Sequence, residues 1–292
     1  MDIANLQAFV SVAESGSFSA ASAQLYLTQP AISKRIAALE DELATRLFDR
    51  LGRQVNLTEP GRALLPRAQK ILLDVEDSRR ALRNLSGKAS GLLRIGTSHH
   101  IGLHRLPPVL RAYTKQFTDV ELDIQFMDSE QACRAVEQGK LELGIVTLPL
   151  QASDVLRTQI IWPDPLSIVV SKQHPLAKMN RINLKQLVEH KAILPAHGTF
   201  TREIIEKAFA AESLHVNISL ATNYLETIKM MVSVGLGWSI LPDSMLSKDI
   251  KTLPVRGLHL QRQLGIVWHG GRTLSNAAQA LQQLLRTEAQ LR

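Results

Sequence analysis

Residues 16–43, GSFSAASAQLYLTQPAISKRIAALEDEL, have the pattern of two helices joined by a tight turn. Ser17 or Ser19 can cap the first helix, because a hydroxyl accepts hydrogen bonds from the free amides of a helix's first turn. Thr28 caps the second helix, and Pro30 lies in its first turn, where a missing N–H costs nothing. The stretch therefore predicts a helical hairpin near the start of the chain.

The second of these helices has one apolar face and one face of short or polar residues. Its apolar residues recur at spacings of four, three and four, at Ile32, Ile36, Leu39 and Leu43. Gln29, Ser33 and Lys34 fall on the other face, near the helix N-terminus. Such a helix is typical of DNA recognition, since its opening residues meet base edges while its back packs on a partner helix. An ordinary helical hairpin is the alternative that this pattern leaves open.

Two short strand-like segments follow, LFDR at 47–50 and VNL at 55–57, and predict a two-stranded wing. Arg50 and Arg53 are expected at or near its tip, in contact with phosphates or the minor groove. Solvated hairpin charges are the alternative. The whole chain carries a net charge of +7, but residues 1–58 hold five basic and six acidic side chains. A DNA-binding surface must therefore come from where these charges are placed.

A long helix is predicted from residue 59 to about residue 85, capped by Thr58 and stopped by Gly87. Pro66 lies inside this helix and is expected to kink it. A heptad pattern runs through it, at Leu64, Ala68, Ile71, Val75, Ser78, Leu82 and Leu85. A solitary rod of about 40 Å would leave this seam in water, so we expect a second copy of the chain to cover it.

After a KASG hinge at 88–91, strand and helix patterns alternate to the end of the sequence. This alternation predicts an α/β domain with a largely parallel sheet. Lobe I is expected to comprise about residues 92–161 and 264–292, and lobe II about residues 162–263. Two α/β lobes with crossing connections place a cleft between them, where ligands usually bind.

The first 61 residues resemble the N-terminal domain of LysR-type transcriptional regulators. The matching motifs are LQAFVSVAESGSFSAAS at 6–22, LTQPAISKRIAALEDEL at 27–43, LFDRLGR at 47–53 and LTEPG at 57–61. The resemblance implies an α/β multidomain chain with a C-terminal effector domain that resembles type-2 periplasmic binding proteins. The domains would be a winged helix-turn-helix at 1–58, a linker (dimerisation) helix at 59–87, the hinge at 88–91 and the two-lobed effector-binding domain at 92–292.

The same resemblance implies the partners of the chain. They are double-stranded promoter DNA, a small-molecule effector, a second copy bound through the linker helix, further copies in a homotetramer, and RNA polymerase. The residues expected to bind DNA are Thr28, Gln29, Pro30, Ser33, Lys34, Arg35, Arg50 and Arg53. No cofactor is expected besides an organic-acid effector.

Three loops that follow predicted strands carry hydroxyl groups, and ligands of open α/β sheets favour these carboxyl ends. In the resembled family the same loops hold the effector, which implies roles for Ser98, His100, Thr147, Thr199 and Thr201. The full expected set adds Thr97, His99, His197, Arg202 and Asn223. The alternatives are that Thr97 and Ser98 only cap the next helix, and that Asn223 and Glu226 pair internally.

The paired histidines His99 and His100, together with Arg202, favour an anion with more than one charge, such as a dicarboxylate. His104 follows His100 by four residues, a spacing that also suits a metal ion. Because no cysteine or carboxylate lies near these histidines in the sequence, we assign no metal site. Trp162, Trp238 and Trp268 are expected in the core.

The single cysteine, Cys133, cannot form an intrachain disulfide and suits a reducing cytosol. The first residues, MDIANLQAFV, lack the basic start of a signal peptide, and no apolar run reaches the length of a membrane span. We therefore expect a cytoplasmic protein without a membrane partner.

Three other functions compete with a regulator. An enzyme is disfavoured because the chain holds no P-loop, no GxSxG and no GxGxxG after a strand, and Cys133 has no evident base. A solute-binding module for transport needs export and has no DNA-binding head. An architectural DNA-binding protein would bind DNA without responding to any metabolite.

Overall fold

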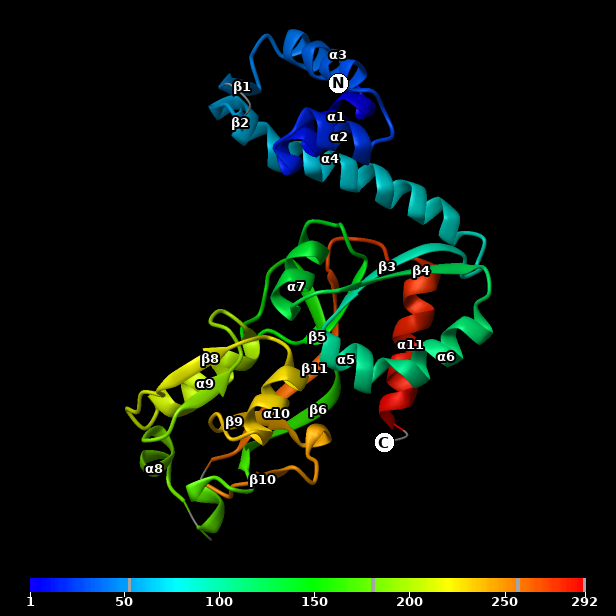
Figure 1. The fold of residues 1–292 in the computed structure, drawn as a ribbon. Helices are drawn as coiled ribbons and strands as arrows, with labels where there is room; N and C mark the ends of the chain where they lie inside the picture. The colour runs from blue at the N-terminus through cyan, green and yellow to red at the C-terminus, as the bar shows by residue number, and fades with distance from the viewer. Residues whose placement is uncertain (52–53, 180–181, 256–257, 291–292) are drawn as a thin grey trace. The chain divides into compact units, whose positions relative to one another are not determined.

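The computed structural model describes residues 1–51, 54–179, 182–255 and 258–290 (Figure 1). It divides into two compact units, Met1–Leu85 and Ser86–Arg292. The N-terminal unit contains the elements α1 (Ile3–Ser15), α2 (Phe18–Gln24), α3 (Gln29–Glu42), β1 (Phe48–Leu51), β2 (Gln54–Leu57) and α4 (Glu59–Asn84).

The helices α2 and α3 form the predicted helical pair. Ser17 rather than Ser19 caps α2, by accepting a hydrogen bond from the backbone N–H of Ala20. Between the helices, Tyr26 adopts a left-handed backbone (φ +53°), which turns the chain sharply. The apolar face of α3 is buried against α1 and α2, as expected, so the opposite face is left to the solvent.

The wing is a two-stranded antiparallel ribbon in which Phe48 pairs with Leu57. Glu40 of α3 anchors its start, because its carboxylate accepts hydrogen bonds from the backbone N–H groups of Leu47 (2.7 Å) and Phe48 (3.3 Å). The Phe48 ring packs into the core of the unit. Of the two arginines expected near the tip, Arg50 belongs to β1 and Arg53 lies outside the described residues.

The long helix α4 is continuous through Pro66. Its predicted seam divides into two parts. Leu64, Ala68 and Ile71 pack into the core of their own N-terminal unit, so the expectation that a second copy covers the whole seam is wrong for this half. Leu82 and Leu85 remain 69% and 82% exposed.

The second unit is built on a seven-stranded mixed sheet with the strand order β10-β6-β11-β5-β3-β4, and β9 also pairs with β6. Lobe I holds β3 (Gly91–Thr97), α5 (His99–His104), α6 (Leu106–Gln116), β4 (Val120–Phe126), α7 (Ser129–Glu137), β5 (Leu143–Thr147) and the closing helix α11 (Asn276–Gln290). Lobe II holds α8 (Leu184–Val188), β7 (Ala192–Leu194), α9 (Phe200–Ala210), β8 (Ile218–Ala221), α10 (Leu225–Ser233), β9 (Ser239–Pro242) and β10 (Ile250–Thr252).

Two long strands, β6 (Leu156–Ser171) and β11 (Leu260–His269), pass through both lobes as an antiparallel pair. Trp162 and Leu264 belong to the core of lobe I, whereas Leu166 and Leu260 belong to the core of lobe II. Because these strands run opposite to their neighbours, parallel pairing within this sheet is limited to β3 with β4 and with β5. The expectation of a largely parallel sheet is therefore wrong.

Candidate effector cleft and DNA-recognition helix

The helix α3, which the sequence predicts to be the recognition helix, presents its N-terminal end to solvent. Thr28 caps it, with its hydroxyl accepting a hydrogen bond from the backbone N–H of Ala31 (3.4 Å). The expected DNA-binding residues on this helix and its cap are exposed at Thr28, Gln29, Pro30 and Lys34 and half-buried at Ser33 and Arg35. The arrangement leaves polar side chains accessible at the end of the helix that would meet base edges.

A cavity of about 50 Å³ lies between the two lobes. Lobe I lines it with Ser98, His99, His100, Asp128, Ser129, Glu130 and Thr147, and lobe II with Pro195, Thr199, Thr201, Asn223 and Leu225. Arg262, from the strand β11 that joins the lobes, completes the lining. Seven of the ten residues expected to bind an effector are thus brought together here.

The floor of the cleft contains a buried group of charges where β6 and β11 pass between the lobes. Asp164 and Arg262 lie opposite each other in the strand register. The Asp164 carboxylate accepts hydrogen bonds from Arg262 (2.6 Å) and from Arg105 of lobe I (3.1 Å). Arg262 also donates to the hydroxyl of Thr201 on α9 (3.2 Å). Two guanidinium groups against one carboxylate give this floor a positive charge.

Two residues that line the cleft carry buried polar atoms without hydrogen-bond partners among the described residues. Within the described residues, neither ring nitrogen of His100 nor the Nη2 atom of Arg262 has a hydrogen-bond partner. Burial, and then the nearby Arg262 guanidinium, lower the pKa of His100 to about 3, so its ring is neutral at neutral pH. Because a buried polar group without a partner costs about 1–3 kcal/mol, a bound ligand would be stabilised by pairing with these groups.

Polar side chains of lobe I close the cleft against lobe II. Glu130 accepts a hydrogen bond from the backbone N–H of Phe200, at the start of α9 (2.5 Å), and burial raises the pKa of Glu130. Asn223 donates to Asp128 (2.6 Å), while its oxygen accepts from the backbone N–H of Ala196 (2.9 Å). The internal pairing that the sequence left open for Asn223 is therefore present, although this residue also lines the cleft.

Three of the expected effector residues do not line the cavity. The hydroxyl of Thr97 is buried and donates to the backbone oxygen of Ile145 (2.8 Å). His197 is exposed to solvent. Arg202 was expected to grip a carboxylate of the ligand, but it donates to Glu206 one turn further along α9 and to the backbone oxygen of Pro195.

Sequence reasoning also missed residues of the cleft, of which Arg262 is the most buried charged one. Its role depends on pairing with Asp164, ninety-eight positions away, which local patterns do not reveal. One local signal was present: Asp164 lies between Pro163 and Pro165 in an otherwise apolar run. An acid in that position needs a partner when the run is buried.

Comparisons with known proteins add to this geometry. Residues 3–62 match the family model "Bacterial regulatory helix-turn-helix protein, lysR family", and residues 86–290 match the "LysR substrate binding domain" model. The chain is 69% identical, over 108 residues, to an uncharacterised HTH-type transcriptional regulator from the ibpB-leuC intergenic region of Azotobacter vinelandii; the match covers 37% of this chain and 75% of that one. Curated relatives matched over nearly the whole chain are also named as transcriptional regulators, not as enzymes.

Solved structures share the fold. A full-length OxyR variant from Pseudomonas aeruginosa superposes with a TM-score of 0.70 at 24% identity, covering 98% of both chains. The effector-binding domain of QuiR, solved in complex with shikimate, gives a TM-score of 0.63 at 20% identity, over 69% of this chain and 98% of that chain. The OxyR variant shares the fold of the whole chain, a helix-turn-helix followed by a two-lobed α/β domain. The QuiR structure shares the fold of the two-lobed domain alone.

Replacing Asp164 by Asn tests whether the floor of the cleft needs its negative charge. Asp164→Asn keeps the shape but leaves two arginines without a counter-charge, so we expect a loss of about 3–5 kcal/mol in the free energy of unfolding. Denaturant unfolding followed by tryptophan fluorescence measures it, because all three tryptophans lie in the second unit. The exposed Asp154→Asn change is the matched control. A loss from Asp164→Asn as small as that from the control would contradict this account.

Proposed function

Because the chain belongs to the LysR family of DNA-binding transcriptional regulators, with an effector-binding domain, we propose that a small organic anion held between its two lobes controls how it binds promoter DNA. Regulators of this family bind promoter DNA and small-molecule effectors and form oligomers. The observation that carries the proposal is the buried Arg262 at the floor of a cleft lined with hydroxyls.

The chemistry of the cleft favours an anionic ligand. Arg262 and Arg105 outnumber Asp164 at the floor, and Thr147, Thr199 and Thr201 line the walls with hydroxyl groups. Asp128 and Glu130 also line the cleft, but each already accepts a hydrogen bond, from Asn223 and from the backbone N–H of Phe200. A carboxylate accepts hydrogen bonds from both kinds of donor. QuiR, which shares this fold, binds shikimate, itself an organic acid, in its effector domain. Sequence reasoning pointed to a dicarboxylate, and we keep that class as the proposal although Arg262 takes the place of Arg202.

The small size of the cavity suggests how a ligand could change the relation of the two lobes. A volume of about 50 Å³ is small for an organic acid, and we propose that the lobes separate to admit one. Glu130 holds the start of α9 in the closed form, where the free amides of a helix N-terminus attract anions. A ligand carboxylate competing with Glu130 would alter the relation of the lobes, and we infer that this change reaches the DNA-binding heads of the oligomer.

Oligomerisation supplies paired DNA-binding heads in this proposal. The second half of the α4 seam, with Leu82 and Leu85 exposed, fits a dimer contact between two copies of the helix. Further assembly gives the proposed homotetramer. A cytoplasmic location and a contact with RNA polymerase follow from the proposed role at promoters. Within the described residues, no helix is long and apolar enough to cross a membrane.

Two substitutions distinguish residues that discriminate between DNA sequences from residues that contribute to binding of any DNA duplex. Gln29→Ala should reduce discrimination between sequences by about 1–3 kcal/mol per base pair read. Arg53→Ala should weaken binding to all duplexes alike and lower the salt dependence by about one unit of slope. The preferred sites are first selected from a random duplex pool with the unaltered protein, and anisotropy titrations then compare selected and scrambled duplexes. An unchanged preference in Gln29→Ala would show that α3 is not the recognition helix.

Calorimetry with the full-length protein and a panel of mono- and dicarboxylic acids tests the effector. We expect dicarboxylates to bind, and Thr147→Val to weaken them by about 10- to 100-fold, because a hydrogen bond to a charged group is worth about 1.5–3 kcal/mol. Thr252→Val, on the exposed strand β10, is the matched control and should bind as the unaltered protein does. If no dicarboxylate binds at millimolar concentration, the proposed ligand class is wrong.

A further inference from the structure

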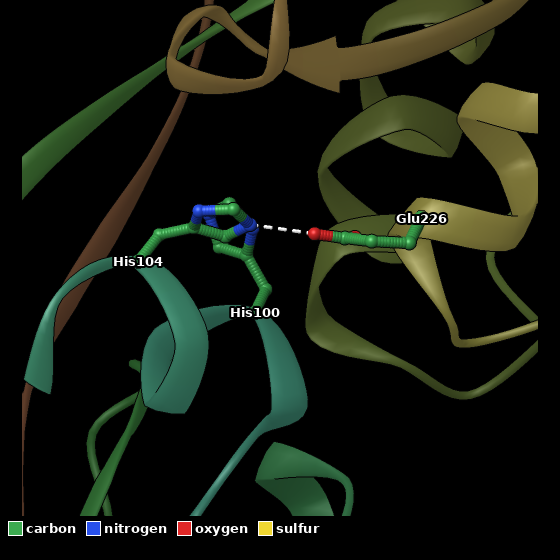
Figure 2. Close-up of side chains that lie close together, drawn as sticks. All are labelled: His100, His104 and Glu226. Atoms are coloured by element: carbon green, nitrogen blue, oxygen red, sulfur yellow. Dashed lines mark hydrogen bonds and ion pairs between the residues drawn. The ribbon is translucent and has the colours of Figure 1, made fainter. Parts of the chain in front are cut away.

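Three side chains with metal-binding atoms meet where lobe I faces lobe II (Figure 2). His100 and His104 lie one turn apart on α5, and Glu226 reaches toward them from α10. One ligand atom from each residue lies within 4.8 Å of the other two. The closest pair is His104 Nε2 and Glu226 Oε1, at 2.5 Å.

The structure places a carboxylate beside His100 and His104, which the local sequence does not. The spacing of His100 and His104 suits a metal ion, but no carboxylate lies near them in the sequence, and for that reason no metal was assigned there. Glu226 is distant in sequence, and the packing of the lobes brings it to the histidine pair. The absence of a nearby carboxylate in the sequence is therefore no argument against a metal ion at these histidines.

His100 gives a second, independent indication of a ligand. Its side chain is 5% exposed, and neither of its ring nitrogens has a hydrogen-bond partner among the described residues. A ring buried in this way is stabilised by any group that pairs with one of its nitrogens. His104 and Glu226 are 38% and 46% exposed, so an ion can reach the cluster from solvent.

We propose that His100, His104 and Glu226 form a binding site for Zn²⁺ that ties α5 of lobe I to α10 of lobe II. Two imidazoles and one carboxylate, with water in the fourth position, are a ligand set that Zn²⁺ takes in proteins. Ligand atoms around one tetrahedral zinc ion lie roughly 3.3 Å apart. Zinc binding therefore requires the Nε2 atom of His104 and the Oε1 atom of Glu226 to move slightly apart from 2.5 Å. Those ligand atoms of the cluster that lie up to 4.8 Å apart must move closer together.

The charges around the cluster are mixed. Arg262 and Arg105 lie near His100, and Asp164, which accepts hydrogen bonds from both of them, offsets one of their two positive charges. Glu226 adds a negative charge directly at the site. Since His100 also lines the cleft, a bound ion would sit at its edge and strengthen the contact between α5 and α10, where His104 and Glu226 already form a hydrogen-bonded pair.

Calorimetric titration of full-length protein, free of any histidine tag, with Zn²⁺ tests the site. We expect one ion per chain, and a weakening of more than about 100-fold in His104→Gln and in Glu226→Gln, since losing a ligand costs more than the 10- to 100-fold typical of an outer-shell partner. Co²⁺ as a substitute should give the visible absorption of a four-coordinate ion in the unaltered protein, and this absorption should be lost in both variants.

The double change Glu212→Gln with His215→Gln is the control. Both residues are exposed in lobe II and lie outside the cluster, so Zn²⁺ binding should be unchanged. Far-UV circular dichroism shows whether each variant is folded. Failure of the unaltered protein to bind Zn²⁺ below millimolar concentration, or equal binding in Glu226→Gln, would overturn the inference. Neither result would affect the organic-acid titrations, so the two proposals fail independently.

Discussion

The antiparallel pairing of β6 with β11 holds the two lobes of the second unit together, and the buried pair Asp164 and Arg262 lies where these strands pass from one core to the other. Removing a single partner from such a pair leaves an uncompensated buried charge. The pair also fixes the chemistry of the cleft, because the guanidinium faces the cavity and holds Thr201 of α9. The stability of the fold and the proposed ligand preference therefore depend on the same two side chains.

Outside this strand pair, the described hydrogen bonds between the facing surfaces of the lobes join polar groups, and two ring contacts accompany them. Phe200 of α9 packs against an apolar cluster of lobe I, and the rings of His99 and Tyr224 lie 5.0 Å apart. Glu130 binds the start of α9, Asp128 binds Asn223, and His104 binds Glu226. Each is a hydrogen bond that water or a ligand can replace at small net cost. The largest apolar cores of the two lobes are separate clusters, and the apolar contact that crosses between the lobes is that of Phe200 with a smaller cluster of lobe I. This combination suits a hinge that responds to what occupies the cleft.

Local signals made much of the N-terminal unit predictable from the sequence. Thr28 as a cap and the four-three-four spacing of the α3 apolar residues act within one helix, and both appear in the structure. The three predicted loops at strand ends led to six of the cleft residues, because each loop is recognised from its own local sequence. Arg262 and Asp164 were out of reach because each matters through a partner distant in sequence. Internal pairing was foreseen as an alternative for Glu226, but its partner His104 was not. The prediction that Arg202 binds the ligand was wrong, because its guanidinium instead donates a hydrogen bond to Glu206, one turn further along α9.

The central claim is that a ligand in the cleft changes the relation of the two lobes. Pulsed electron–electron distance measurements test it most directly, with spin labels at Lys115→Cys in lobe I and Lys207→Cys in lobe II of a full-length Cys133→Ala background. Labels at Lys115→Cys and Gln131→Cys, both in lobe I, report any change within one lobe. Adding an acid found to bind should shift the distance distribution between the lobes and leave the one within lobe I unchanged. An interlobe distribution that stays the same at saturating ligand would contradict the account.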